Sequence, residues 1–138
     1  MKKSLIIPIS LYAFLCTGVV AADTHKLFAI DENQCNPPVG ADLRGNIENG
    51  KQLHIKNCAD CHGVDGKANV VVMHMDETPK DQSDPTYMKN LPDPFLYIAI
   101  CKGGEGIGKS YVMSPWGDFF TDQEIKDLIA WIRTFSGT

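Results

Sequence analysis

Cys58-Ala59-Asp60-Cys61-His62 is the stretch of this sequence on which its fold depends. It has the pattern C-x-x-C-H, which attaches c-type haem. At this spacing the two thiols can add to the two vinyl groups on one edge of a porphyrin, and the adjacent imidazole can reach the iron. The pattern therefore predicts one haem c, bound covalently through Cys58 and Cys61, with His62 as an iron ligand.

Three other chemistries are compatible with this pair of cysteines. A zinc site would need two further ligands, and Cys35 and Cys101 are available but do not form a second closely spaced pair. A thioredoxin-like redox motif expects a βαβ context, which the sequence lacks. A disulfide within the motif would leave His62 without a role. Haem attachment is the interpretation that uses all three residues.

The second axial ligand decides what such an iron can do, because two protein ligands leave no open position and favour electron transfer. Met113 lies in the segment Tyr111–Gly117, which is long enough to cross over the ring and is pinned by a proline. Residues 73–75 lie only 11 to 13 positions after His62, which is a tight route around a porphyrin. The residues after the motif that could coordinate iron are Met73, His74, Met75, Met88 and Met113. We expect Met113 to be the ligand, against the ordinary role of a methionine as core filler.

Helix signals elsewhere predict an all-α chain with long loops. A helix is expected from Ile47 to Cys58, with Asn46 as its N-cap. Asp84 and Asp93 each precede a proline, and we expect both to be N-caps with proline at the first helical position.

The C-terminal segment has the clearest helical pattern. Thr121 and Glu124 form a capping box, and Trp131 borders the apolar face that follows. That face has the spacing i, i+3, i+4, i+7 and consists of Ile125, Leu128, Ile129 and Ile132. The glycine-rich residues 103–108 predict a turn rather than a nucleotide site. Val70–Val72 is expected in an extended loop, because no partner strand is nearby.

The first 22 residues have the pattern of a secretory signal peptide. A basic start and a short, broken apolar run precede Val20-Ala21-Ala22, whose small residues suit cleavage after Ala22. We therefore expect export to the periplasm and no membrane span in the mature protein. Residues 23–45 are then an irregular N-terminal arm, and residues 46–138 form the haem domain.

The mature chain is acidic. The formal charge of the full chain is −4. Loss of Lys2 and Lys3 with the signal peptide changes it to −6, because 11 basic and 17 acidic side chains remain. This balance argues against nucleic acid as a partner and suits a protein that meets a basic docking face.

Two cysteines remain after the haem takes its pair. In an oxidising compartment, Cys35 and Cys101 either form a disulfide or stay as a buried thiol and a free or intermolecular one. We expect the disulfide, which would tie the N-terminal arm to the haem domain. Closing a loop of this length is worth about 4 kcal/mol on the chain-entropy model.

Together these features resemble the class I cytochromes c over residues 46–136. The match consists of Gly50 on the first expected helix, the C-x-x-C-H-G motif, the Met113 loop with Trp116, and the capped last helix with Trp131. The resemblance implies a cytochrome c-like fold in which the first and last helices cross at Gly50 and Trp131. It also implies that Trp116 lies beside a haem propionate. The expected cofactor-binding residues are thus Cys58, Cys61, His62, Met113 and Trp116, with His62 and Met113 on the iron.

The sequence departs from that family after the haem motif. Members often have a Gly-Pro pair there, whose carbonyl holds the ring of the ligand histidine. Here Lys67-Ala68-Asn69 follows Gly66, and Pro79 is the nearest proline. Which carbonyl orients His62 therefore stays open, and that hydrogen bond tunes the iron.

The resemblance implies a one-electron carrier between redox proteins rather than an enzyme. Histidine and methionine on one iron favour the reduced state. The alternative is a fixed cytochrome subunit of a dehydrogenase, reductase or oxidase complex, docked through the arm at residues 23–45. A haem enzyme or gas sensor would need an open iron position, which Met113 disfavours. The donor and acceptor proteins are not identified by the sequence.

Overall fold

The computed structural model describes residues 35–37, 43–69 and 75–138. Their helices, in chain order, are α1 (Ile47–Asn57), α2 (Ala59–His62), α3 (Pro85–Met88), α4 (Asp93–Lys102), the 3-10 turn η3 (Glu105–Ile107) and α5 (Asp122–Ser136). No strand occurs within these three ranges. The all-α fold class is confirmed.

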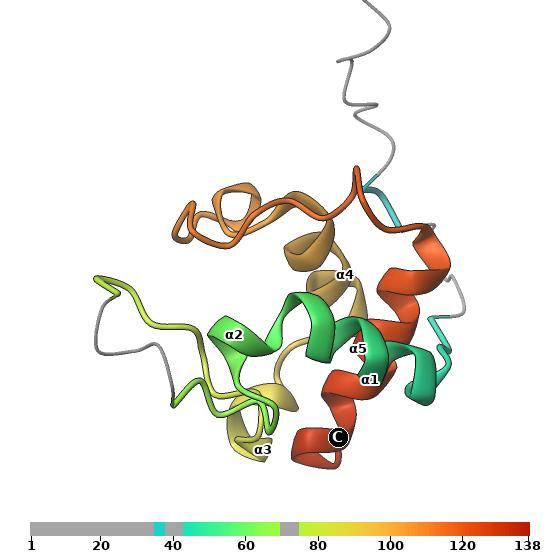
Figure 1. Ribbon diagram of the computed structural model, residues 1–138, viewed down its shortest axis with the longest axis horizontal. Coiled ribbons are helices and arrows are strands. Elements are labelled where there is room, and N and C mark those ends of the chain that lie inside the picture. The colour runs from blue at the N-terminus through green and yellow to red at the C-terminus, as the bar shows by residue number, and fades with distance from the viewer. Residues whose placement is uncertain (1–34, 38–42, 70–74) are drawn as a thin grey trace, which may run out of the picture.

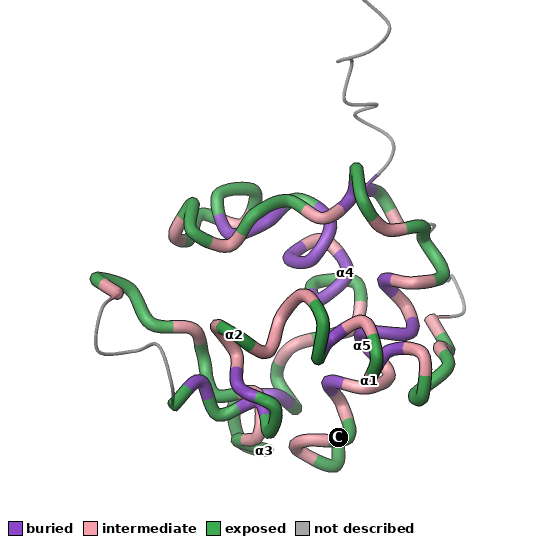
Figure 2. Tube along the Cα trace, in the orientation of Figure 1, coloured by how far each residue is buried: buried purple, intermediate pink, exposed green. Residues whose placement is uncertain are grey.

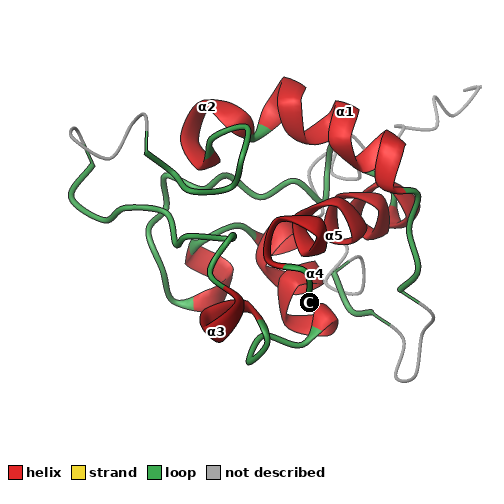
Figure 3. Cartoon of the chain, turned by 90° about the horizontal axis from the view of Figure 1, so that it is seen from below, coloured by secondary structure: helices red, strands yellow, loops and turns green. Residues whose placement is uncertain are grey.

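The two longest helices, α1 and α5, come from opposite ends of the described chain and cross at close range (Figures 1 and 3). Gly50 permits this approach. A Cβ atom on Gly50 would overlap the carbonyl oxygen of Asp127 and would lie 3.0 Å from the Cβ of Trp131. The expected crossing of Gly50 and Trp131 is confirmed, and the nearest neighbour of Gly50 is the backbone of Asp127.

A buried carboxylate fastens the start of α1 to α5. Asp127 accepts hydrogen bonds from the Asn46 backbone N–H at 2.7 Å, the Asn49 side-chain amide at 2.7 Å and the Gln123 amide at 2.9 Å. Burial by itself raises the pKa of this carboxyl, but the hydrogen bonds outweigh burial and lower the pKa. Asp127 therefore stays ionised and holds the N-terminal end of α1 in place.

Most of the predicted helix starts are confirmed. Asn46 caps α1 by accepting from two backbone N–H groups, and Asp84 caps α3 in the same way. Thr121 and Glu124 form the reciprocal capping box at the start of α5. These local signals were readable because each depends on side chains within three residues of the cap.

The predicted cap of α4 is wrong. Asp93 is the first helical residue, and Pro92 occupies the cap position with no side-chain hydrogen bond. The Asp93 carboxylate instead pairs with Arg133 of α5, with Nη2 and Oδ1 2.7 Å apart. Because this carboxylate is engaged by another helix, it does not cap its own.

The helix that leads into the haem motif breaks at Cys58. α1 ends at Asn57, one residue earlier than predicted, and α2 begins at Ala59. Cys58 has φ −120° and ψ −31°, although its N–H still donates to the His54 carbonyl at 2.8 Å. The short helix α2 is therefore set off from α1 and carries the second half of the motif.

The core is formed mainly by α4 and α5 with Met88 of α3, and Figure 2 shows buried stretches along both α4 and α5. All four residues of the predicted apolar face of α5 are buried. The apolar core comprises Met88, Leu96, Tyr97, Ile100, Ile125, Leu128, Ile129 and Ile132, together with Cys35 and Cys101.

Cys35 and Cys101 form a disulfide, as predicted, with their Cα atoms 5.6 Å apart. Both residues are buried. The bond joins the segment 35–37 to the end of α4. The predicted turn at residues 103–108 is also confirmed, and it contains η3.

Some sequence predictions fall outside the described residues. They concern the signal peptide at residues 1–22, most of the arm at residues 23–45, the loop at Val70–Val72 and the two candidate ligands Met73 and His74. Within the described ranges, no helix combines the length and apolar character that crossing a membrane requires.

Candidate functional site

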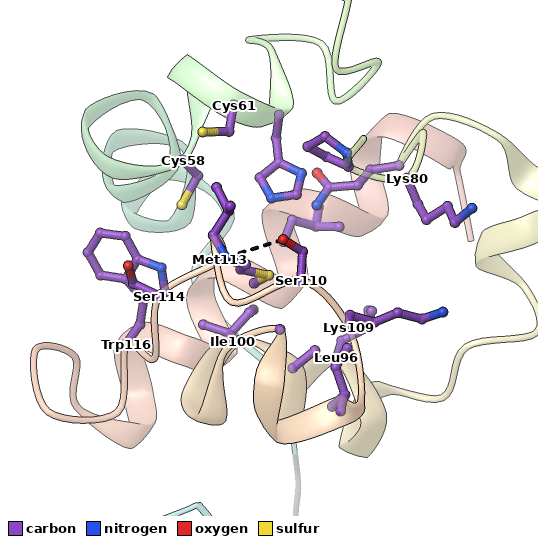
Figure 4. A pocket seen from close by; sticks show the side chains of 18 of the residues that line it. Cys58, Cys61, Lys80, Leu96, Ile100, Lys109, Ser110, Met113, Ser114 and Trp116 are labelled. Atoms are coloured by element: carbon purple, nitrogen blue, oxygen red, sulfur yellow. Dashed lines mark hydrogen bonds between the residues drawn. The ribbon is translucent and has the colours of Figure 1, made fainter. Parts of the chain in front are cut away.

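A mainly apolar pocket lies between α2 and the loop that carries Met113 (Figure 4). Its volume is about 370 Å³, within the usual range for small-molecule and cofactor sites. Every described helix contributes to its walls. Much of the lining is apolar and includes Met88, Leu91, Phe95, Leu96, Ala99, Ile100, Leu128 and Ile132. Such a wall suits a flat apolar ring.

Cys58 and Cys61 both line this pocket, and both are free thiols. Burial, and secondarily the neighbouring Cys61, raise the pKa of Cys58 to about 11. Cys58 is therefore a neutral thiol at pH 7. The alternative of a disulfide between these two residues is wrong for this structure.

His62 lines the same pocket at the end of α2. Burial lowers the pKa of its imidazole, so the neutral, metal-binding form is favoured. Its Nδ1 is buried without a hydrogen-bond partner. Pro79 also lines the pocket, but the carbonyl that would orient His62 remains unassigned.

Met113 lines the pocket from the loop that faces α2 (Figure 4). It lies 51 residues after His62 in the sequence. It is half-buried, and its carbonyl accepts from the Gly104 N–H at 2.9 Å. Met75 and Met88 line the pocket as well. Met88 is 1 % exposed and belongs to the core cluster.

The zinc and thioredoxin-like alternatives both fail. Cys35 and Cys101 are bonded to each other and cannot serve as metal ligands. In the described part of the chain, no cluster of three or more histidine, cysteine or acidic side chains could hold a metal ion. The βαβ context of a thioredoxin-like motif is also missing from those residues. Two thiols and an imidazole beside one apolar pocket are the donor set of a covalently attached haem.

Comparison with known proteins agrees with this geometry. The family profile described as cytochrome c matches residues 47–136, from the first residue of α1 to the last of α5. This chain belongs to the cytochrome c family. A search of curated proteins finds no match.

Solved structures of c-type cytochromes are similar to this cytochrome. The KustC0563 c-type cytochrome is 24 % identical with a TM-score of 0.52, over 62 % of this chain and 95 % of that one, and at this identity the likeness concerns the fold. Cytochrome cL from Hyphomicrobium denitrificans is 27 % identical with a TM-score of 0.50, over 68 % of this chain and 52 % of that one. Cytochrome cL from the marine methylotrophic bacterium Methylophaga aminisulfidivorans is 27 % identical with a TM-score of 0.48, over 64 % and 53 %. The chain spans about half the length of either cytochrome cL.

Membership of the family establishes the general chemistry. This protein is a c-type cytochrome and an electron carrier, and covalently bound haem c is the cofactor that the family implies. The pocket and its two free thiols suit that cofactor.

Trp116 of this cytochrome lines the pocket beside the cysteines (Figure 4). Its ring stacks on Phe120 at 5.1 Å between centroids and meets the edge of Phe119 at 6.0 Å. Its contact with a haem propionate, implied by the resemblance, stays a prediction.

His54 is a residue of the pocket wall that the sequence analysis did not select. It is fully buried on α1, and neither ring nitrogen has a hydrogen-bond partner in the structure. Its ring contacts Phe135 at 5.3 Å and Trp131 at 6.5 Å between centroids. The spacing of four residues between His54 and Cys58 places both on one face of a helix, so the sequence could have marked His54 as a neighbour of the haem site.

The pocket also has a cationic side. Lys80 and Lys109 line it, and among the residues that the structure describes no other lysine or arginine does so. In Figure 4 they extend on the side away from Cys58 and Cys61. Glu77 is the acidic residue of the lining. The side of the pocket opposite the cysteines is therefore suited to an anionic group.

Proposed function

We propose that this cytochrome is a periplasmic one-electron carrier with a single haem c, ligated by His62 and Met113. The observation that carries the proposal is that His62 and Met113, far apart in sequence, line one apolar pocket together with two free thiols. When bound, the haem iron supplies a couple between its ferrous and ferric states.

Each residue of the motif has one task in this proposal. The thiols of Cys58 and Cys61 hold the porphyrin edge through two thioethers. His62, neutral because burial lowers its pKa, donates its imidazole to the iron. The buried Nδ1, which has no hydrogen-bond partner in the structure, would then carry the remaining proton and need an acceptor.

Met113 would supply the second protein ligand of the iron. Its thioether is a soft, neutral donor that favours the reduced iron. The apolar wall of the pocket acts in the same direction, because burial in a medium of low polarity disfavours the extra positive charge of the ferric state. Two ligands on separate, anchored segments keep water and small molecules off the iron.

Lys80 and Lys109 are the residues that we assign to the haem propionates. The vinyl groups and the propionates of a haem lie on opposite edges of the ring, so attachment at Cys58 and Cys61 would direct the propionates to the opposite side. That is the side on which both lysines extend (Figure 4). Trp116, which lies by the cysteines, is then farther from the propionates than the resemblance implies.

Export to the periplasm rests on two observations. The first 22 residues have the composition of a signal peptide. The buried disulfide between Cys35 and Cys101 supports an oxidising compartment, because such bonds are rare in reducing ones. Electron donors and acceptors are then other exported redox proteins.

The test is spectroscopic. The protein is expressed with export and haem maturation, and its mass is expected to show one covalent haem. The ferric form should have the weak far-red band of histidine–methionine ligation, and the ferrous form should not bind carbon monoxide. Met113→Ala should keep the haem, lose the band and bind carbon monoxide, while Met88→Leu and Met75→Leu, as matched controls, should behave as the parent. Carbon monoxide binding by the parent protein, or loss of the band in a control alone, contradicts the proposal.

A further inference from the structure

The loop that carries Met113 is held against the C-terminal end of α4 by three backbone hydrogen bonds. The Gly104 N–H donates to the Met113 carbonyl at 2.9 Å. The Trp116 N–H donates to the Ile100 carbonyl at 3.1 Å, and the Gly117 N–H donates to the Cys101 carbonyl at 3.0 Å. Ile100 and Cys101 belong to the last turn of α4, whose carbonyls have no partner within the helix. The loop therefore serves as the cap of α4.

The disulfide lies directly behind this contact. A Cβ atom on Gly117 would come within 2.6 Å of the Cys101 Sγ and 3.0 Å of the Cys35 Sγ. Both sulfur atoms thus pack against the backbone of the loop, four residues after Met113. Ile100 lines the pocket and Cys101 does not, so the disulfide braces the loop from outside the haem site.

The close fit extends to the glycines after α4. Gly103 has φ +70°, and a Cβ atom there would lie 2.5 Å from the Met113 carbonyl oxygen. Before Met113, Tyr111 and Val112 are 81 % and 48 % exposed, so that side of the loop is held mainly by its backbone contacts with these glycines. A segment with few apolar contacts opens locally at low free energy unless another bond restrains it.

We infer that the Cys35–Cys101 disulfide is a positioning device for Met113: it holds the end of α4 and the ligand loop together and so keeps the methionine on the iron. This inference rests on the proposed function, since it takes Met113 as the ligand. Without the bond, the end of α4 and the loop can separate more often. Each opening leaves the iron accessible to an external ligand.

The experiment compares the holoprotein with the double variant Cys35→Ser/Cys101→Ser. The readouts are the affinity of the ferric form for imidazole and the pH at which the far-red band is lost. The apparent affinity of an external ligand scales with the population of the open state. We expect imidazole to bind on the order of tenfold more tightly to the double variant, and the band to be lost at lower pH.

A matched control separates positioning from general destabilisation. Gly50→Ala weakens the crossing of α1 and α5, far from the loop, and should lower the melting temperature without raising the affinity for imidazole. An unchanged affinity in the double variant, or an equal increase in Gly50→Ala, overturns the inference. If the parent protein lacks the far-red band, the proposed ligation by Met113 fails instead, and the two failures are distinguished.

A second route covers poor folding of the double variant. The disulfide of the parent holoprotein is reduced and alkylated without air, which leaves the thioether-bound haem in place. Mass spectrometry verifies two alkylated cysteines, and imidazole binding is measured after reoxidation of the iron. We expect imidazole to bind on the order of tenfold more tightly to the reduced and alkylated protein than to the parent, and no increase contradicts the inference.

Discussion

Gly50 of α1 lies against the backbone of Asp127 on α5, close enough that the carbonyl carbon of Asp127 would be 2.5 Å from a Cβ atom on Gly50. The atoms that face Gly50 belong to the backbone of Asp127 and to the Cβ of Trp131, and neither can rotate away. A side chain on Gly50 can therefore be accommodated only if the two helices move apart. The first and last helices of the domain are thus positioned by the absence of a side chain.

Gly50→Val should lower the free energy of unfolding by at least the roughly 1–3 kcal/mol that overpacking usually costs. Helix propensity cannot be the cause, since valine is a better helix former than glycine. Denaturant unfolding of the holoprotein measures the change. Gln52→Val, at an exposed position of α1, is the control and should change stability little. Equal stabilities of the parent and Gly50→Val would refute the close contact.

His54→Phe should stabilise the protein and reduce its sensitivity to acid. Burial, and secondarily the neighbouring His62, lower the pKa of His54 to about 4. The unfolded chain takes up this proton near its ordinary pKa of about 6.5, so the unfolded state binds more protons between pH 6.5 and 4. Stability contributed by the neutral ring is therefore present above pH 6.5 and is lost as the pH falls through this window.

Phenylalanine removes both the titration and two unpartnered buried nitrogens. Since each buried polar group without a partner costs about 1–3 kcal/mol, His54→Phe should unfold at higher denaturant at pH 7. The gain should be larger at pH 4.5. Unfolding curves of both proteins at the two pH values measure it. If the free energy of unfolding falls by the same amount from pH 7 to pH 4.5 in the parent and in the variant, His54 is not the titrating group.

Lys80→Gln and Lys109→Gln should each lower the reduction potential. Loss of a positive charge near the propionates favours the ferric state and raises the pKa of a propionate. We expect the ratio of oxidised to reduced protein at a fixed ambient potential to rise by about threefold. For scale, a tenfold change in this ratio corresponds to a shift of about 59 mV in the potential of a one-electron couple. Potentiometric titration from pH 5 to 9 measures both effects.

Lys102→Gln is the matched control for these lysines. Lys102 is exposed at the end of α4 and does not line the pocket. Lys102→Gln should shift the reduction potential less than the two pocket variants do and should leave the propionate pKa unaltered. Lys80→Arg, which keeps the positive charge, should behave as the parent protein does. If Lys102→Gln has the same effect as the pocket variants, the assignment of the propionates to Lys80 and Lys109 is wrong.

Arg133→Met should destabilise the protein mainly through lost hydrogen bonds to backbone carbonyls. The guanidinium donates to the Met88 carbonyl at 2.8 Å and to the Leu91 carbonyl, besides its pairing with Asp93. Asp93 is 41 % exposed at its side chain, so solvent screens the ion pair and its share is small. A loss of about 1–3 kcal/mol is expected.

Arg133→Lys should restore only part of this stability, because an ammonium cannot reproduce the fork of donors of a guanidinium. Lys56→Met, at an exposed position of α1, controls for the loss of a charge. Thermal unfolding at low and high salt provides the measurement. If the loss of stability in Arg133→Met disappears in high salt, it comes from the ion pair with Asp93 and not from the hydrogen bonds to the Met88 and Leu91 carbonyls.

The sequence by itself determined the features that depend on neighbouring residues. The haem motif at Cys58, Cys61 and His62, the caps at Asn46 and Asp84, and the capping box at Thr121 are set by spacings of a few residues. The apolar face of α5 follows from helical periodicity in the same way. The cytochrome c family could be named from these local patterns together with the loop at Met113.

Tertiary structure decided what depends on residues distant in the chain. The sequence left the disulfide between Cys35 and Cys101 as one of two outcomes, because nothing in a sequence fixes the distance between two side chains 66 positions apart. Asp93 has the sequence of a helix cap, but packing of α5 brings Arg133 to it. His54 and the two pocket lysines were not selected, since their importance arises only where separate segments enclose one cavity. Local hydrogen bonds and periodicity act along the chain, whereas burial and charge environment are properties of the folded packing.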